Sequence, residues 1–595
     1  MKTTSHLRVG VRAALVALVG FALQGAGFAL TVTNNKDNAP STPLIVGSLR
    51  WAIAGTATNG LVDFASTMKG KTILLKAGQL VVDRAMTIRG LGCNSLTVSG
   101  NNVSRVFFTN ATSTISGQPG VTISDMTITK GNAVGPDLSG AGNDANGGGI
   151  HNVGSLELLR LCVTGNTANL GGGGGIYNRG TLSSVTECTV SYNTAGQNGG
   201  GIFDEQDMTI MRCAIFNNMA GGDGGGIQEA GTANVINTTI AANRATGSGG
   251  GINDQGGATL KTYNVTIAGN TAAVGGGMAN VPFFGASWEL RNTIVGDNTA
   301  PVAPDVSNGF GAPISRGYNL IENTSGAAAG SFLPTDQVGV DAKLGPLQNN
   351  GGPTLTKALL PGSPAIDKGS NANLLPSMTT DQRNMARIIN GGMSPTVDVG
   401  AYEYATARAL KFEAIQDLTP CLSSTDSRTV ANARSAIRSI QCSLSPRLWV
   451  NDTKLTACGQ LVFEYEEDAA YSIQKILKYS PDVACVKEAL DAVQDLMQAD
   501  EQIARAAISD AVACNGNASY IAKANSELVT AQASIAKQDY KGAIEHYEHA
   551  WEYAQKACNR DRDDDECRRE REDCEREDRD RWGDDDRCGG DHADD

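Results

Sequence analysis

A block of glycines followed by one large apolar residue recurs along the first half of the chain, and this repeat limits the folds open to it. Successive copies lie 26, 26, 25, 25 and 26 residues apart. A constant period in this range is typical of a solenoid in which each copy forms one coil. The period is too short for a propeller blade, and the LxxLxL frame of a leucine-rich repeat is absent. The apolar residues are Ile150, Ile176, Ile202, Ile227, Ile252 and Met278.

Each copy also contains a short β-branched segment and an asparagine. Segments such as CTVSY, CAIFN and TTIAA alternate with period two, as strands do. We therefore expect a parallel β-helix whose coils stack about 4.8 Å apart. The glycines form corners of the coil, and the asparagines mark another corner, where side-chain amides bond to each other up the stack. These asparagines are Asn166, Asn193, Asn218, Asn243, Asn270 and Asn298.

The N-terminus has the layout of a secretory signal peptide. Lys2, Arg8 and Arg12 precede the apolar run AALVALVGFAL, and small residues follow it. The run is short for a membrane span, and no later run of about 18 apolar residues exists. A buried helix is the alternative. We expect residues 1–29 to be removed on export, which leaves a mature chain without a transmembrane segment.

Composition divides the mature chain into three parts. Residues 30–405 carry the glycine repeat, whereas residues 406–558 show the three- and four-residue apolar spacing of helices. Residues 559–595 hold 18 Asp and Glu against 9 Arg, which indicates a disordered or solvated acidic tail. We predict a mainly β fold, a β-helix solenoid followed by a small α-helical bundle. A net charge of −14 without a basic stripe makes nucleic acid and anionic membranes poor candidates as partners, so we expect neither.

The 13 cysteines include no CxxC pair, so a zinc-ribbon or thioredoxin-like site has no support. Export favours disulfides among the six cysteines of the helical region, but their spacing does not give the pairing. Cys188 and Cys213 occupy equivalent repeat positions, and we expect stacked buried thiols, with a disulfide between them as the alternative. The six cysteines are Cys421, Cys442, Cys458, Cys485, Cys514 and Cys558.

Several motifs resemble those of exported bacterial β-helix proteins. GGGIHNVGSLEL and FNNMAGGDGGGI are similar to the repeats of polymorphic outer-membrane proteins. GSLRWAIAGT resembles the opening segment of CSLREA-type proteins, although Gly47 replaces the leading cysteine. LGPLQNNGGPTLTKALLPGSPAID, followed by DQRNMARI and VDVGAYEY, resembles the closing segment of choice-of-anchor Q proteins, with Asn384 in place of a glycine. The resemblance implies a right-handed β-helix with specialised ends and implies no particular chemistry. We expect SLRWAI to be a helical N-terminal cap and the closing segment to finish the other end.

Acidic residues stand two positions after the apolar residue in three consecutive copies. They are Asp204, Glu229 and Asp254, flanked in the neighbouring copies by asparagines. Carboxylates about 5 Å apart raise one another's pKa or recruit a cation, so the three residues are candidates for a Ca²⁺ ladder. The same spacing also suits the two carboxyl groups of a retaining glycosidase. The interpretation that we favour over both is a polar turn ladder without chemistry, because a solenoid repeats its polar corners in any case; of the other two, a Ca²⁺ site ranks before catalysis.

Other candidate site residues are few. His151 is interpreted as an outward surface residue, and Phe283, Phe284 and Trp288 as either a sugar-stacking platform or packing residues. Residues 140–300 hold 11 Asp and Glu against 6 Lys and Arg, which does not favour an enzyme acting on polyuronate. On the helical part, His546 and His549 have the spacing of metal ligands. No third ligand is evident from the sequence, so we interpret them as surface histidines.

These observations favour an exported, non-catalytic binding or adhesion protein at or near the cell surface. Its expected partners are extracellular polysaccharide or surface proteins, and no cofactor is expected apart from the Ca²⁺ considered above. The first alternative is a carbohydrate-active enzyme, a polysaccharide lyase or glycoside hydrolase, on the same scaffold. The second is a structural matrix protein whose helical domain binds a partner.

Overall fold

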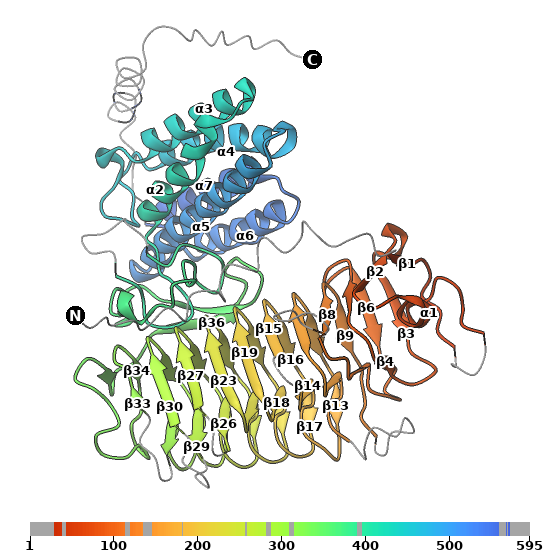
Figure 1. Cartoon of the computed structure of the whole chain (residues 1–595). Coiled ribbons are helices and arrows are strands. Elements are labelled where there is room, and N and C mark those ends of the chain that lie inside the picture. The colour runs from red at the N-terminus through yellow and green to blue at the C-terminus, as the bar shows by residue number, and fades with distance from the viewer. Residues whose placement is uncertain are drawn as a thin grey trace, which may run out of the picture. The chain divides into compact units, whose positions relative to one another are not determined.

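The computed structural model describes residues 29–38, 43–113, 120–134, 145–180, 183–255, 259–280, 287–308, 314–388 and 396–558, together with Cys567, Arg569 and Arg571. These residues form two compact units (Figure 1), a solenoid unit that extends to Tyr404 and a helical unit that begins at Ala405. The predicted signal peptide, apart from Ala29, lies outside the described residues. So does the acidic tail, apart from the three residues just named.

The solenoid unit is a parallel β-solenoid of about 8 turns, as predicted. Each full coil contributes one strand to each of three long sheets, and Figure 1 shows the coils stacked side by side. Sheet A contains, in spatial order, β1 (Leu30–Val32), β2 (Gly60–Phe64), β5 (Met86–Arg89), β8 (Val121–Ser124), β11 (Leu156–Leu159), β15 (Ser183–Thr186), β19 (Asp207–Met211), β23 (Thr232–Ile236), β27 (Thr259–Tyr263), β30 (Ser287–Arg291) and β33 (Ile314–Ser315). Sheet B contains β3 (Lys71–Leu74), β6 (Leu96–Ser99), β9 (Thr127–Thr129), β12 (Cys162–Thr164), β16 (Thr189–Ser191), β20 (Ala214–Phe216), β24 (Thr239–Ala241), β28 (Thr266–Ala268), β31 (Ile294–Gly296), β34 (Leu320–Ile321) and β35 (Gln337–Val338). Sheet C contains β32 (Val306–Asn308), β29 (Met278–Asn280), β26 (Ile252–Asp254), β22 (Ile227–Glu229), β18 (Ile202–Asp204), β14 (Ile176–Asn178), β10 (Ile150–Asn152), β7 (Phe107–Thr109) and β4 (Leu80–Val82). A short fourth sheet contains β13 (Thr167–Ala168), β17 (Thr194–Ala195), β21 (Met219–Ala220) and β25 (Arg244–Ala245).

The register of sheet C confirms the repeat read from the sequence. Ile150 pairs with Ile176, which pairs with Ile202, and the series continues to Met278 and Val306. These side chains are at most 2% exposed and belong to one continuous core that runs through the coils. Burial of a fully enclosed aliphatic side chain contributes about 1.5–3 kcal/mol, so the stacked isoleucines are a main source of stability.

The asparagines form a buried ladder, as predicted. In each rung the backbone N–H and the Nδ2 amide of one asparagine both donate to Oδ1 of the next, over 2.9–3.0 Å. The second Nδ2 hydrogen goes to a strand carbonyl of the preceding coil, for example from Asn243 to Ile215. Because these groups are almost fully buried, the ladder satisfies donors and acceptors that water cannot reach.

The glycine blocks form close corners between coils. Gly224 has a φ of +66°, which few L-residues adopt. At Gly225, a Cβ would lie 2.4 Å from the carbonyl oxygen of Gly250 and 2.5 Å from the carbonyl carbon of Arg244. The first glycine permits the turn, and the second permits the neighbouring coil to approach.

The ends of the solenoid are built differently from each other. α1 (Leu49–Gly55) is the predicted N-terminal helix, capped by the Ser48 side chain, and is followed by the 3₁₀ helix η1 (Ser66–Met68). The closing segment, by contrast, packs along the side of the stack and does not serve as an end cap alone. Gln382 bonds to Thr239 and to the Cys213 carbonyl oxygen, well back along the coils. The segment contains the antiparallel pair β36 (Leu344–Gln348) and β37 (Thr356–Leu359) and the 3₁₀ helix η2 (Asn371–Asn373).

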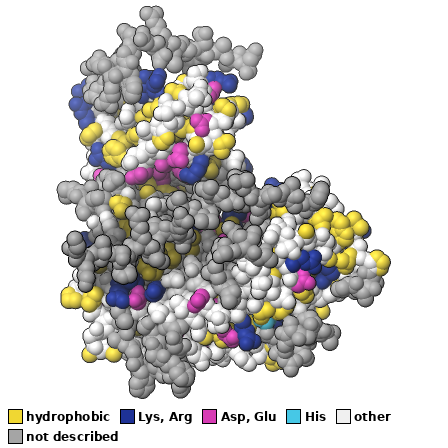
Figure 2. Space-filling view, in the orientation of Figure 1, with side chains coloured by type: hydrophobic (Ala, Val, Ile, Leu, Met, Phe, Trp, Pro, Cys, Tyr) yellow, Lys and Arg dark blue, Asp and Glu magenta, His cyan; other side chains and the backbone are white. Residues whose placement is uncertain are grey.

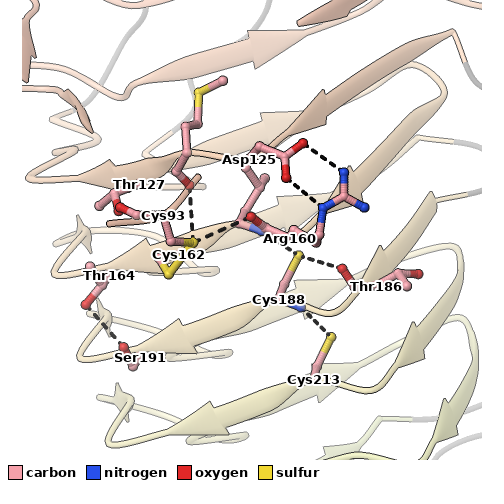
Figure 3. Close-up of a disulfide and its surroundings, with 12 residues drawn as sticks. Cys93, Asp125, Thr127, Arg160, Cys162, Thr164, Thr186, Cys188, Ser191 and Cys213 are labelled. Atoms are coloured by element: carbon pink, nitrogen blue, oxygen red, sulfur yellow. Dashed lines mark hydrogen bonds and ion pairs between the residues drawn. A yellow bond between two sulfur atoms is a disulfide. The ribbon is translucent and has the colours of Figure 1, made fainter. Parts of the chain in front are cut away.

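A disulfide and two free thiols lie close together in the early coils (Figure 3). Cys93 and Cys162 are disulfide-bonded, a pairing that the sequence did not indicate. Cys188 and Cys213 are free and buried, which confirms stacked thiols rather than a disulfide between them. The Cys188 backbone N–H donates to the Cys213 sulfur over 3.4 Å. In the next coil Thr238 occupies the equivalent position, and its hydroxyl accepts a hydrogen bond from the Cys213 backbone N–H.

The helical unit is a bundle, as predicted. Among the described residues it has three disulfides with both partners placed, Cys421–Cys485, Cys458–Cys567 and Cys514–Cys558. In the part of the chain that the structure describes, no helix is long and apolar enough to cross a membrane. The helices are α2 (Ala407–Leu418), α3 (Ser427–Ser443), α4 (Gln460–Tyr479), α5 (Val483–Ala513), α6 (Ala518–Ile535) and α7 (Tyr540–Ala557), with 3₁₀ turns η3 (Thr419–Ser423) and η4 (Pro446–Leu448).

Substitution of one ladder asparagine tests the importance of the buried amides. Asn243→Ala leaves the Asn218 donors and the Asn270 Oδ1 acceptor with fewer partners, and each unpaired buried group costs about 1–3 kcal/mol. We expect the free energy of unfolding of the solenoid to fall by about 2–4 kcal/mol, measured as a lower guanidinium midpoint. The exposed neighbour Arg244→Ala is the control and should change the free energy by less than about 0.5 kcal/mol. Equal midpoints for the two variants would contradict the prediction.

Candidate functional site

The structure brings the three predicted acidic residues together in consecutive coils. Asp204 pairs with Glu229, and Glu229 pairs with Asp254, at the ends of β18, β22 and β26. Their exposed fractions are 0%, 1% and 0%. The carboxyl groups therefore face the interior of the solenoid and do not line an open groove. No substrate in solution can contact them in this conformation.

The acidic residues continue a longer ladder of buried polar side chains. Thr109 donates to Asn152 Oδ1 over 2.7 Å, Asn152 Nδ2 to Asn178 Oδ1 over 2.7 Å, and Asn178 Nδ2 to Asp204 Oδ1 over 2.6 Å. At Glu229, Oε1 accepts instead from the Gly231 backbone N–H over 2.7 Å. The ladder thus passes hydrogen bonds from coil to coil until it reaches the carboxyl groups.

Each of the three carboxyl groups keeps one oxygen without a hydrogen-bond partner among the described residues. These atoms are Asp204 Oδ2, Glu229 Oε2 and Asp254 Oδ1. The other Asp254 oxygen accepts from the indole Nε1 of Trp288 over 2.8 Å. A buried carboxylate with an unpartnered oxygen is costly, so the neutral acid is favoured.

The pKa values follow from this environment. Burial raises the pKa of Asp204 to about 7 and that of Asp254 to about 6, against hydrogen bonds that lower both. Burial also raises the pKa of Glu229 well above its ordinary value, and the neighbouring charge of Asp204 adds to the effect. The three carboxyl groups therefore bind protons at a higher pH than exposed Asp and Glu side chains do. The Ca²⁺ ladder stays a prediction, and it requires these groups to lose those protons and to be reached by the ion.

The aromatic and histidine candidates are also buried. The interpretation of His151 as a surface residue is wrong, because its side chain is 1% exposed. It points outward from β10 but lies edge-on between Phe108 and Tyr177, with ring centroids 5.3 and 5.0 Å away. Trp288 is a core residue, 1% exposed, and cannot act as a sugar platform in this conformation. Phe283 and Phe284 lie outside the described residues.

Another buried charged cluster lies in the helical unit. Lys411 Nζ donates to Glu466 Oε1 over 2.5 Å and to Asp500 Oδ1 over 2.8 Å, and all three side chains are fully buried. Attraction to the two carboxylates keeps the pKa of Lys411 raised in spite of its burial. This cluster ties α2 to α4 and α5 and has no contact with solvent, so its role is structural.

The outward face of sheet A carries a regular row of polar side chains. Each member is partly exposed, and Thr209, for example, stands between the inward residues Met208 and Ile210 of its strand. Because the strands pair in register, the members lie one rung apart, about 4.8 Å. We name this set the sheet A row. Its members are Thr87, Thr122, Glu157, Ser184, Thr209, Asn234, Lys261 and Glu289.

The sequence contained a signal for the sheet A row that was missed. In DMTIM, TANVI and TLKTY, one polar residue stands between two inward-facing residues, at Thr209, Asn234 and Lys261. The acidic position after each glycine block is the more conspicuous signal, because it carries charge in three consecutive copies. Without the coil geometry, outward and inward polar positions look alike.

Charge on the visible surface is mixed. On the face shown in Figure 2, acidic and basic side chains are interspersed, and the described residues there form no continuous stripe of one sign. Much of the solenoid on this face is white, which marks backbone and small polar side chains. Such a surface suits an uncharged, hydroxyl-rich partner better than a polyanion.

No protein-family model, curated protein or solved structure matches this chain. Fold and site therefore rest on the sequence and the structure alone.

Stability as a function of pH tests the buried carboxyl ladder. The folded-state pKa of Asp204, about 7, exceeds the ordinary value of about 3.9, so protonation stabilises the fold. This contribution is fully present below about pH 4 and is lost as the pH rises through about 7. Asp204→Asn keeps the acceptor for Asn178 and removes the titration. We expect the free energy of unfolding of the variant to exceed that of the parent by about 1–3 kcal/mol at pH 8. At pH 4.5 the two values should differ little.

Denaturant unfolding at both pH values measures this difference. Asp297→Asn, which removes an exposed carboxylate from the same solenoid, is the control and should act alike at both pH values. A pH-independent effect of Asp204→Asn would show that the carboxyl group does not titrate in this range.

Proposed function

We propose that this chain is an exported, non-catalytic binding protein whose sheet A row contacts an uncharged extracellular polysaccharide. The observation that carries the proposal is the division of polar groups between the two sides of the coil. The acidic residues that could do chemistry are sealed inside, at most 1% exposed, whereas the outward row is polar and regular. A regular row of weak contacts suits a partner that is itself a repeating polymer.

Rigidity of the scaffold supports this proposal. Each row position is fixed by parallel pairing on both sides, for example Asn234 between Thr209 and Lys261. A backbone that is held in place before binding loses little conformational freedom on binding. Several weak contacts along one polymer chain then add up, because after the first contact the others form within one complex.

Export is supported by independent observations. The N-terminal residues have the layout of a signal peptide, and several disulfides are consistent with an extracellular protein. The motifs shared with CSLREA, choice-of-anchor Q and polymorphic outer-membrane proteins also favour export, and we include membership of that group in the proposal. Surface proteins remain the alternative partners.

A carbohydrate-active enzyme is the competing function. It requires an acid and a base that reach the sugar. The acidic residues with raised pKa values in the repeats, Asp204, Glu229 and Asp254, are buried below the surface in this structure. An experiment that measures both retention on a polysaccharide and release of oligosaccharides therefore distinguishes the two functions.

Incubation of the mature protein with a panel of uncharged and acidic polysaccharides tests the proposal. We expect retention on at least one uncharged polysaccharide and no released oligosaccharide by mass spectrometry. Thr209→Glu with Asn234→Glu should reduce retention about tenfold or more, because it places charge in the sheet A row. Met219→Glu with Arg244→Gln changes the net charge equally, lies on the short fourth sheet of the same two coils, and should leave retention unchanged.

Two outcomes contradict the proposal. Release of oligosaccharides that is lost in Asp204→Asn would make the protein an enzyme. Retention that is equal in both double variants would place binding elsewhere on the chain.

A further inference from the structure

The helical unit brings together three side chains that have the composition of a metal site. Glu527 lies on α6, and His546 and His549 lie one turn apart on α7, which packs against α6. One ligand atom from each residue can be chosen so that all three lie within 4.8 Å of one another. Among the described residues, this is the one group of three His, Cys, Asp or Glu side chains with that property.

The contact across the two helices is already formed. His546 Nδ1 lies 2.8 Å from Glu527 Oε2, and the centroids of the two imidazole rings lie 6.4 Å apart. In the described part of the chain, His549 makes no hydrogen bond, so an ion pair between Glu527 and His546 does not account for its position. A cation between the helices would use all three groups.

The site is accessible without being fully exposed. The side chains of His546 and Glu527 are 29% and 23% exposed, and His549 is also partly buried. Partial burial lowers the local dielectric and strengthens metal–ligand attraction. The remaining exposure allows an ion to enter and keep water as a further ligand.

The two helices are held together on both sides of the site. The Asn517 N–H donates to the Ala557 carbonyl oxygen over 2.9 Å, next to the disulfide Cys514–Cys558. On the other side, Gln532 Nε2 donates to the Tyr547 hydroxyl over 3.1 Å. Ligands on elements fixed in this way need little rearrangement to bind.

The donor set selects the kind of ion. Two imidazoles and one carboxylate suit Zn²⁺ and related divalent transition metals, whereas Ca²⁺ and Mg²⁺ prefer oxygen donors alone. We propose that Glu527, His546 and His549 form a binding site for a divalent transition metal, with Zn²⁺ as the preferred ion. The missing third ligand that made the two histidines look like surface residues is supplied by the neighbouring helix.

Binding of Zn²⁺ to the full chain tests the proposal. The protein is prepared without a histidine tag, treated with a chelator, and titrated with Zn²⁺ by calorimetry. We expect one tight site per chain that His549→Ala weakens at least about tenfold and Glu527→Gln weakens measurably. The control Glu552→Gln removes a carboxylate from the same helix, where it pairs with Lys556, and should leave Zn²⁺ affinity unchanged.

Cobalt provides a second measurement that does not depend on affinity alone. Co²⁺ bound to nitrogen and oxygen ligands gives visible absorption without a thiolate charge-transfer band, and His549→Ala should remove that absorption. Circular dichroism of the metal-free proteins confirms that the variants are folded. Equal Zn²⁺ affinity in the parent and in His549→Ala, or weak binding at many sites only, would overturn the proposal.

Discussion

Stacking of equivalent residues in successive coils is the constraint on which the solenoid depends. Parallel pairing puts the same side chain position of each coil about 4.8 Å above the last. An apolar position then builds a continuous core, and a buried polar position must find its partner in the coil above or below. Asparagine meets this demand because its side chain carries both donors and acceptors. Asn193, for example, accepts from Asn166 and donates to Asn218 in the same geometry.

The same constraint explains the behaviour of the acidic residues. In the ladder from Thr109 through Asn152 and Asn178, each side chain donates to the next. Asp204 accepts the last of these bonds, but an ionised carboxylate has no donor to offer to the following coil. Burial in this ladder raises the pKa values of Asp204 and Glu229, and the neighbouring charge of Asp204 adds to the effect at Glu229. Acidic residues at equivalent positions of consecutive coils, a pattern typical of a catalytic or metal-binding site, can thus equally belong to a buried polar ladder.

The two units distribute their polar groups differently. In the solenoid, some titratable side chains are buried in ladders, others form ion pairs such as Asp125 with Arg160, and three stand in the sheet A row. The helical unit buries one charged cluster around Lys411 and leaves a histidine and carboxylate group partly open between α6 and α7. Disulfides cross-link the helical unit, whereas the solenoid combines rung pairing with the disulfide Cys93–Cys162. The binding proposals for the two units are therefore independent of each other.

The sequence by itself determined the solenoid fold and the length of its repeating coil. The spacing of Ile150, Ile176 and Ile202 predicted the register, because a period-two strand and a glycine corner leave few ways to stack. The asparagine ladder, the N-terminal helix and the helical bundle followed from equally local signals. Tertiary structure alone decided which polar residues are buried: Asp204 faces the interior, and His151 points outward but is covered by Phe108 and Tyr177 of the neighbouring coils. It also decided that the closing segment packs along the coils, and that Glu527 comes from a separate helix to join His546, since contacts between distant segments leave no periodic trace in a sequence.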